Sequence, residues 1–155
     1  MNKTLRMACL LVALLHAGTM VAAPAPDMQS ALGWWRTFDD TTGQARGIVQ
    51  IYERGGKLFG RLERSFKPGA AARVCSVCTD ERKNQPILGL LIIRNMKPQD
   101  GEYGGGDILD PDSGTVYRCK MHLEQQGTRL LVRGYIGISL FGRSQTWQRE
   151  AAPPP

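Results

Sequence analysis

Two aromatic segments of strand type stand at opposite ends of the foldable part of this chain, and they restrict its architecture most. The first is the run GWWRT at residues 33–37. The second is VRGYIGISLFGRSQTWQR at residues 132–149, in which two strand-type runs flank an apolar turn punctuated by glycine. Strands at both ends of a chain can pair with each other, and such pairing closes a sheet into a barrel. We therefore expect the first and last strands to be neighbours.

Further strand-type runs fill the region between these ends, and turn residues separate them. We expect strands over residues 33–38, 45–53, 57–66, 102–108, 115–124, 128–135 and 143–149. A long loop is expected at 67–86 and a turn at 97–101, while the apolar run at 87–94 fits either a strand or a short buried helix. The pattern predicts an all-β fold, with eight antiparallel strands in a mostly up-and-down closed barrel. A barrel of this size can hold one small ligand.

The first 23 residues have the features of a secretory signal peptide. Lys3 and Arg6 give a basic start, an apolar centre follows that is too short to span a bilayer comfortably, and small residues end the segment. We expect an exported protein without a transmembrane segment once the signal is removed. The remaining boundaries predicted are a flexible leader at 24–32, a single barrel domain at 33–150 and a disordered tail at 151–155.

The distribution of charge argues against one class of partner. Removal of residues 1–23 leaves 132 residues and lowers the net charge from +6 to +4, because Lys3 and Arg6 leave with the signal. The remaining Lys and Arg residues are scattered singly, and no dense basic run is interleaved with aromatic residues. We therefore expect no nucleic-acid partner. A mildly basic exported protein is still suited to contact with anionic envelope surfaces.

Three cysteines remain after the signal is removed: Cys75, Cys78 and Cys119. An oxidising compartment favours a disulfide, and the odd count leaves one free thiol. We expect a Cys75–Cys78 bridge and a buried Cys119; a bridge from either loop cysteine to Cys119 is the alternative. Zinc would need four ligands, and His122 is predicted to lie on the strand face opposite Cys119. We therefore expect no metal centre and no cofactor.

Candidate functional residues point to binding rather than to catalysis. No Ser–His–acid set follows from the spacing, so the sequence favours a protein that is not an enzyme. Aromatic and flexible side chains on inward positions are candidates for the lining of a cavity, with a packed core as the alternative. We expect a small apolar or amphipathic ligand, or else a structural or protein-interaction module with a filled core. The candidate lining residues are Tyr103, Tyr117, Met121, Tyr135 and Trp147.

The first predicted strand resembles that of the lipocalins, which are barrels of calycin type. The resemblance rests on Gly33 and Trp35 in the run GWW. In that superfamily the tryptophan plugs one end of the barrel, and an arginine from a late strand packs over it. The resemblance implies Arg149 for this arginine, with Arg143 as the second choice.

A denser resemblance covers almost all of residues 33–149. It rests on the segments GWWRTFDDTTG, IYERGGKLFGRL, CSVCTDERKNQPILGL, GGGDILDPDSGTVYRCK and VRGYIGISLFGRSQTWQR. These resemble a family of exported bacterial proteins that is catalogued as domain of unknown function two-one-four-seven. The resemblance implies a periplasmic or secreted barrel of lipocalin type, and it implies no particular activity.

Overall fold

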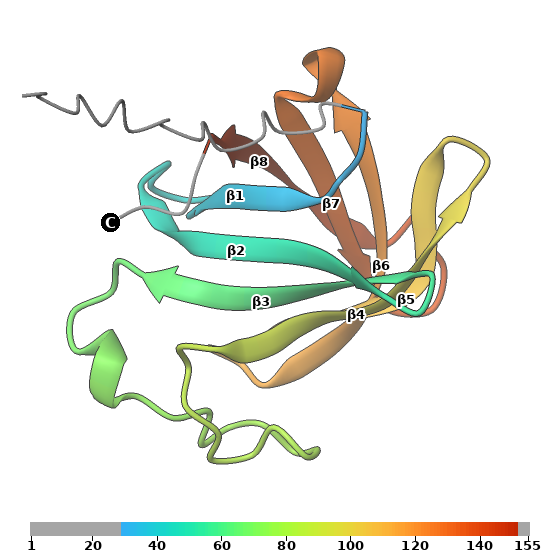
Figure 1. Cartoon of the computed structure of the whole chain (residues 1–155). Coiled ribbons are helices and arrows are strands. Elements are labelled where there is room, and N and C mark those ends of the chain that lie inside the picture. Colours follow the sequence, from blue (N-terminus) through green and yellow to red (C-terminus); the bar gives the residue numbers. More distant parts are fainter. Residues whose placement is uncertain (1–28, 152–155) are drawn as a thin grey trace, which may run out of the picture.

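The computed structural model describes residues 29–151, which form a closed barrel (Figure 1). The strands are β1 (Gly33–Phe38), β2 (Ala45–Arg54), β3 (Lys57–Ser65), β4 (Leu90–Gln99), β5 (Glu102–Asp110), β6 (Thr115–Glu124), β7 (Arg129–Tyr135) and β8 (Gly142–Glu150). Short 3-10 turns, η1 (Ala70–Ala72) and η2 (Gln125–Gly127), lie in two connections. Strands that are neighbours in sequence pair antiparallel, so the predicted up-and-down barrel is confirmed. The predicted signal peptide, residues 24–28 and residues 152–155 lie outside the described residues.

The two aromatic end strands pair with each other, as the sequence predicts. In the β1–β8 ladder Trp35 lies opposite Arg149 and Trp34 lies opposite Glu150. An ion pair between Arg36 and Glu150 bridges the same two strands. This pairing closes the sheet, so that within residues 29–151 each barrel strand has two neighbours and no edge is left open.

The strand β4 begins and ends later than the sequence predicts. Residues 87–89 form a turn in which Leu90 N–H donates to the Ile87 carbonyl oxygen, and the strand then continues to Gln99. The turn predicted over 97–101 is therefore reduced to Asp100 and Gly101. Their φ angles of 43° and 85° are those of a two-residue type I′ hairpin turn, for which Asp-Gly is a preferred sequence. Lys97, Pro98 and Gln99 resemble turn residues in the sequence, but they belong to β4.

The connections between strands gather at two ends of the barrel. The closed end carries the approach to β1 and the short β2–β3, β4–β5 and β6–β7 connections. The open end carries the β1–β2, β3–β4, β5–β6 and β7–β8 connections. The β3–β4 connection is the longest, and it is the green segment that leaves the barrel in Figure 1.

The absence of a side chain at Gly106 allows the backbones of β5 and β4 to approach each other closely. The backbone at Gly106 approaches so closely that a Cβ would lie 2.1 Å from the Arg94 carbonyl oxygen. The β5–β6 register shifts between Tyr103 and Gly106, so the glycine triplet 104–106 forms the irregularity that the sequence suggests. Beyond this shift, Ile108 lies among the residues that line the barrel's interior cavity.

Candidate ligand-binding site

Trp35 plugs the closed end of the barrel. Its side chain is fully buried, and its indole Nε1–H donates a hydrogen bond of 2.8 Å to the Ala31 carbonyl oxygen. The guanidinium carbon of Arg149 lies 4.3 Å from the ring centroid, which is a cation–π contact. Arg143, the second choice for this role, lies instead at the open end and pairs with Asp40.

The Arg149 guanidinium also fixes the chain that precedes β1. It donates hydrogen bonds to the carbonyl oxygens of Ser30 at 2.6 Å, Leu32 at 2.8 Å and Gly127 at 2.6 Å. Gly33 has a φ of 120°, and a Cβ there would lie 3.2 Å from Arg149 Nη1, so glycine leaves space for the guanidinium. Within the predicted leader at 24–32, the carbonyl oxygens of Ser30 and Leu32 are thus bound by Arg149. Composition shows small residues there, but it does not show that their carbonyls bind an arginine on β8.

The interior toward the open end holds a cavity of about 640 Å³. Six strands contribute apolar side chains to it: Val49, Leu62, Ile92, Ile108, Val132 and Trp147. Because the closed end is plugged by Trp35, a molecule would enter this space between the open-end connections. The barrel thus combines a sealed end with an apolar, accessible interior.

The predicted lining residues separate into two groups. Tyr117, Tyr135 and Trp147 are among the residues that line the cavity. Met121 does not line it; its side chain is fully buried in the packed core. Tyr103 lies opposite Met121, and its hydroxyl accepts a hydrogen bond of 3.4 Å from Ala31 N–H at the closed end. Strand alternation predicts which face a side chain occupies but not its height along the barrel, and these two residues lie nearer the closed end than the cavity does.

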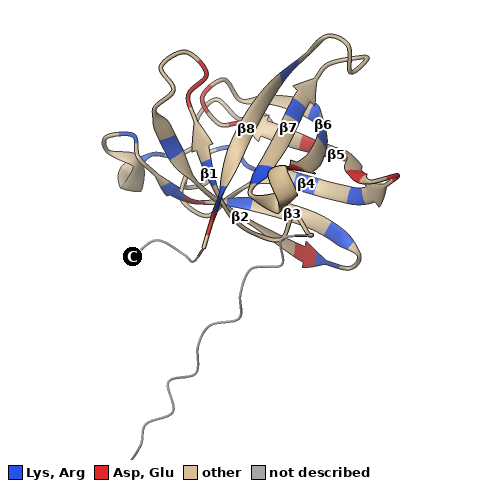
Figure 2. Cartoon of the chain, turned by 90° about the horizontal axis from the view of Figure 1, so that it is seen from above, with Lys and Arg blue, Asp and Glu red and all other residues tan. Residues whose placement is uncertain are grey.

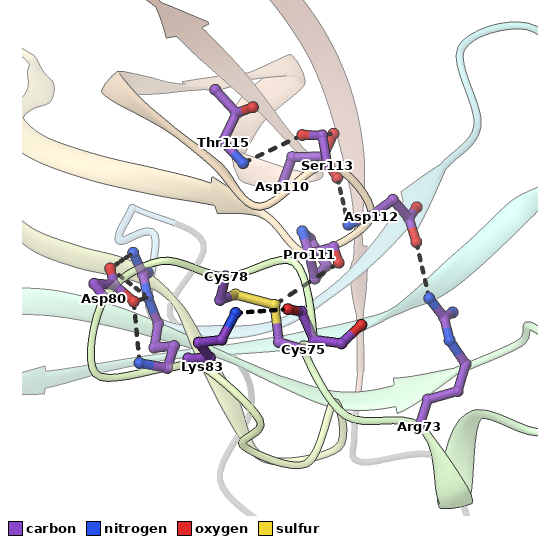
Figure 3. Close-up of a disulfide and its surroundings, with 12 residues drawn as sticks. Arg73, Cys75, Cys78, Asp80, Lys83, Asp110, Pro111, Asp112, Ser113 and Thr115 are labelled. Carbon is purple, nitrogen blue, oxygen red and sulfur yellow. Dashed lines mark hydrogen bonds and ion pairs between the residues drawn. A yellow bond between two sulfur atoms is a disulfide. The ribbon is translucent and has the colours of Figure 1, made fainter.

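Basic residues converge on one carboxylate at the mouth of the cavity. Arg73 Nη2 lies 3.2 Å from Asp112 Oδ1 (Figure 3). Lys67 Nζ lies 2.5 Å from Asp112 Oδ2, and Arg46 pairs with the same carboxylate. Burial raises the pKa of Asp112, but the hydrogen bonds from Lys67 and Arg73 outweigh it, so the pKa lies below its ordinary value. Asp112 is therefore ionised at neutral pH and holds three cations at the mouth.

The disulfide loop supports this cluster from outside. Cys75 and Cys78 form a disulfide and are fully buried, which confirms the predicted bridge. The loop packs against the β5–β6 turn so closely that a Cβ on Gly114 would lie 2.2 Å from the Val77 carbonyl oxygen. Figure 3 shows the bridge beside Pro111, next to Asp112 in that turn. The bridge therefore stabilises the segment that positions the acidic residue of the mouth.

An ion pair between a buried arginine and a partly exposed aspartate attaches the same loop to β4. Arg82 is only 4% exposed; its Nε lies 3.1 Å from both Asp80 carboxylate oxygens, and its Nη2 lies 2.5 Å from Oδ2. Its Nη1 donates to the Leu91 carbonyl oxygen at 3.1 Å. The Arg82 hydrogen bonds lower the pKa of Asp80 to about 2. Sequence reasoning missed this pair, because the run TDERK looks like a solvated loop.

The third cysteine is shielded from solvent. Cys119 is free and fully buried, as predicted, and burial raises the pKa of its thiol to about 12. The thiolate is the reactive form of cysteine. We expect a chain that lacks residues 1–23 to show no reaction with Ellman's reagent when folded at pH 8. One thiol should react per chain after unfolding in guanidinium without reductant, and rapid labelling of the folded protein would contradict the buried position.

His122, the histidine among the described residues, lies on the outer face of β6. His122 is 43% exposed at its side chain, and its Nε2 lies 3.3 Å from Glu124 Oε1. Within residues 29–151, no group of three or more His, Cys, Asp or Glu side chains is arranged to hold a metal ion. In the same residues no helix is long and apolar enough to cross a membrane.

The closed eight-stranded barrel has a counterpart of similar fold among solved structures. A similar solved structure is described as "Protein HP1028 from the human pathogen Helicobacter pylori belongs to the lipocalin family". The two share a TM-score of 0.67 and 17% sequence identity over 78% of this chain and 83% of that chain, a likeness of fold. The chain belongs to the bacterial family DUF2147, described as "Uncharacterized protein conserved in bacteria", whose model matches residues 33–149. A search of the curated proteins gives no match.

Proposed function

We propose that the barrel binds one small amphipathic molecule, with its apolar part in the interior and an acidic group at the mouth. The observation that carries this proposal is the apolar cavity of about 640 Å³, which is open at one end only. Ligand pockets have volumes of about 300–1,000 Å³ and are mainly apolar, with a few polar groups that fix the orientation of the ligand. The alternative, a structural or protein-interaction module with a filled core, would not need this space.

The charges at the mouth support an acidic group on the ligand. Among the lining residues, four are basic, namely Arg46, Lys67, Arg73 and Arg143, whereas only Asp110 and Asp112 are acidic. The Asp110 carboxylate accepts hydrogen bonds from Asp112 N–H and Ser113 Oγ within its own turn. A carboxylate or phosphate on the ligand would share the donors of Lys67 and Arg73 with Asp112. Such charge-assisted hydrogen bonds are stronger than those between neutral groups.

We also propose that the protein acts after export, in the periplasm or outside the cell. The predicted signal peptide, the bacterial family and the Cys75–Cys78 bridge support this location. Disulfides persist in oxidising compartments and are rare in the cytosol. An exported barrel with an apolar interior would carry a molecule that is poorly soluble in water.

Titration calorimetry with three ligands of equal chain length tests the binding proposal. We expect dodecanoate to bind with one molecule per chain and about tenfold more tightly than dodecan-1-ol, because the alcohol lacks the ionic hydrogen bonds. Dodecylamine should bind most weakly, since its ammonium would face the cations of the mouth. Replacing Lys67 and Arg73 together with glutamine should remove the preference for the acid.

The matched control replaces Arg54 and Lys57 with glutamine, which removes the same charge at the closed end. This variant should keep the parent's preference for dodecanoate. Absence of binding by all three compounds would contradict a ligand-binding interior and favour the filled-core alternative. Equal affinity for the three compounds would contradict the proposal that the mouth prefers an acidic group, but it would be consistent with binding in the apolar cavity.

A further inference from the structure

The β7–β8 connection exposes an unusual set of apolar side chains. Ile136, Ile138, Leu140 and Phe141 are 64%, 60%, 75% and 73% exposed, whereas the other exposed large apolar residues among 29–151 reach at most 47%. Single exposed apolar residues are ordinary on a protein surface, but a contiguous group marks an interaction site. We call residues 136–141 the apolar loop.

The apolar loop is held in its outward position by hydrogen bonds. The Arg133 guanidinium donates to the carbonyl oxygen of Ser139 at 2.8 Å and to that of Leu140 at 3.1 Å. Within the loop, Phe141 N–H donates to the Ile138 carbonyl oxygen at 3.2 Å. The exposed side chains therefore project from a formed turn, with an arginine at its base.

Other exposed apolar residues lie at the same end of the barrel. Four belong to the β3–β4 connection and one to the start of β6, both at the open end: Phe66, Val74, Val77, Leu88 and Val116. Within residues 29–151, the closed-end connections contribute none. The apolar loop also lines the cavity through Ile136, Leu140 and Phe141. The exposed apolar residues thus lie at the end of the barrel where the cavity opens.

Two arginines of the hairpin lie near the loop, Arg133 on β7 and Arg143 on β8. Arg143 pairs with Asp40, whereas Arg133 holds the carbonyl oxygens of the loop. On the neighbouring strand β6, Arg118 is exposed, and among the described residues it has no acidic partner. Figure 2 shows Lys and Arg on β6, β7 and β8. An apolar tip with cations at its base is complementary to a surface whose outer layer is negatively charged and whose underlying layer is apolar.

We propose that the apolar loop docks the open end of the barrel on an anionic lipid bilayer. Ile138, Leu140 and Phe141 enter the boundary between headgroups and acyl chains, and Arg118 and Arg133 face the anionic headgroups. This is the combination by which peripheral proteins bind bilayers. A protein partner fits less well, because a stable interface buries about 800 Å² on each side and the protruding loop has only six residues. Docking also places the cavity mouth against the lipid, so an apolar molecule could pass between them without crossing water.

Vesicle co-sedimentation tests this docking independently of the proposed ligand. We expect the protein to sediment with vesicles of phosphatidylcholine and phosphatidylglycerol in equal amounts, much less with phosphatidylcholine alone, and less as salt is raised. Replacing Leu140 and Phe141 together with aspartate should lower the binding at least about tenfold, because two inserted side chains become charged. Far-UV circular dichroism and thermal unfolding should show that this variant is folded.

The matched control replaces Gln125 and Gln126 with aspartate. These exposed residues have φ angles of 48° and 57°, which aspartate tolerates, and they lie at the closed end. This control adds the same charge, and it should bind vesicles within about twofold of the parent. Equal loss in both variants would overturn docking by the loop, as would sedimentation that ignores lipid charge. Loss of dodecanoate affinity or of self-association in the Leu140/Phe141 variant, with vesicle binding unchanged, would show a lid or a dimer contact instead.

Discussion

Replacing Trp35 with alanine is expected to lower the free energy of unfolding by about 3–5 kcal/mol, as the truncation of a large buried aromatic residue does. The indole is fully buried, it satisfies the Ala31 carbonyl, and it supports the guanidinium of Arg149. Its loss therefore removes apolar burial, a hydrogen bond and a cation–π contact of about 1 kcal/mol at one position. Together with Arg149, this side chain connects the residues before β1 with β1 and β8.

Urea unfolding followed by far-UV circular dichroism measures this effect without relying on tryptophan fluorescence. The matched control is Trp34→Ala on the same strand, where the side chain is only partly buried and points away from the core. We expect the control to lose about 1 kcal/mol or less. A Trp35→Ala variant that is as stable as the control would show that the indole does not seal the barrel.

Replacing Asp80 with asparagine is expected to lower the free energy of unfolding by about 3 kcal/mol at neutral pH. Arg82 is buried, and the substitution leaves its charge without a carboxylate, which is costly in a protein interior. The effect should concentrate in the disulfide loop, because the pair joins this loop to β4. Glu81→Gln is the control: the Glu81 side chain pairs with Arg94 but is 72% exposed, so its loss should cost less than about 0.5 kcal/mol.

The pH dependence of unfolding gives the Asp80 pair a second signature. Its pKa is about 2 in the folded protein, against an ordinary value of 3.8, so the folded state favours the ionised form. This contribution is fully present above pH 4 and is lost as the pH falls from about 4 to about 2. We expect the Asp80→Asn variant to lack this loss, so that its stability approaches that of the parent near pH 2. If the difference in free energy of unfolding between the parent and the variant stayed constant across this range, the proposed stabilisation by the ionised Asp80 would be contradicted.

The sequence predicts the barrel because its signals are local. Alternation over residues 115–124 places Cys119 inward, and the aromatic residues near 35 and 147 mark strands that need partners. Cys75 and Cys78 are three residues apart, so their bridge needs no long-range information. The same patterns do not give the height of a residue along the barrel, so they place Tyr103 and Met121 with the cavity residues although neither lines the cavity.

The site at the mouth depends on contacts that no local pattern contains. Asp112 looks like a turn residue in DPDSG, and it also receives Lys67, which is 45 positions away in sequence. Arg82 looks like a solvated loop charge, but it is buried against β4. Both depend on how the β3–β4 connection folds back over the open end. The apolar run of the β7–β8 turn is visible in the sequence, but its exposure at the cavity mouth is not.

Native mass spectrometry of a variant with a filled cavity tests the central claim most directly. Gly134 lines the cavity, its φ is not in the left-handed region, and the nearest atom to an added Cβ would be 3.4 Å away, so Gly134→Leu can fold and extend into the space. Thr146→Leu adds a side chain on the outer face of the adjacent strand β8 as the control. With dodecanoate, we predict one bound molecule on the parent and on the control, and none on Gly134→Leu. Equal binding by all three proteins would show that the ligand does not occupy the interior.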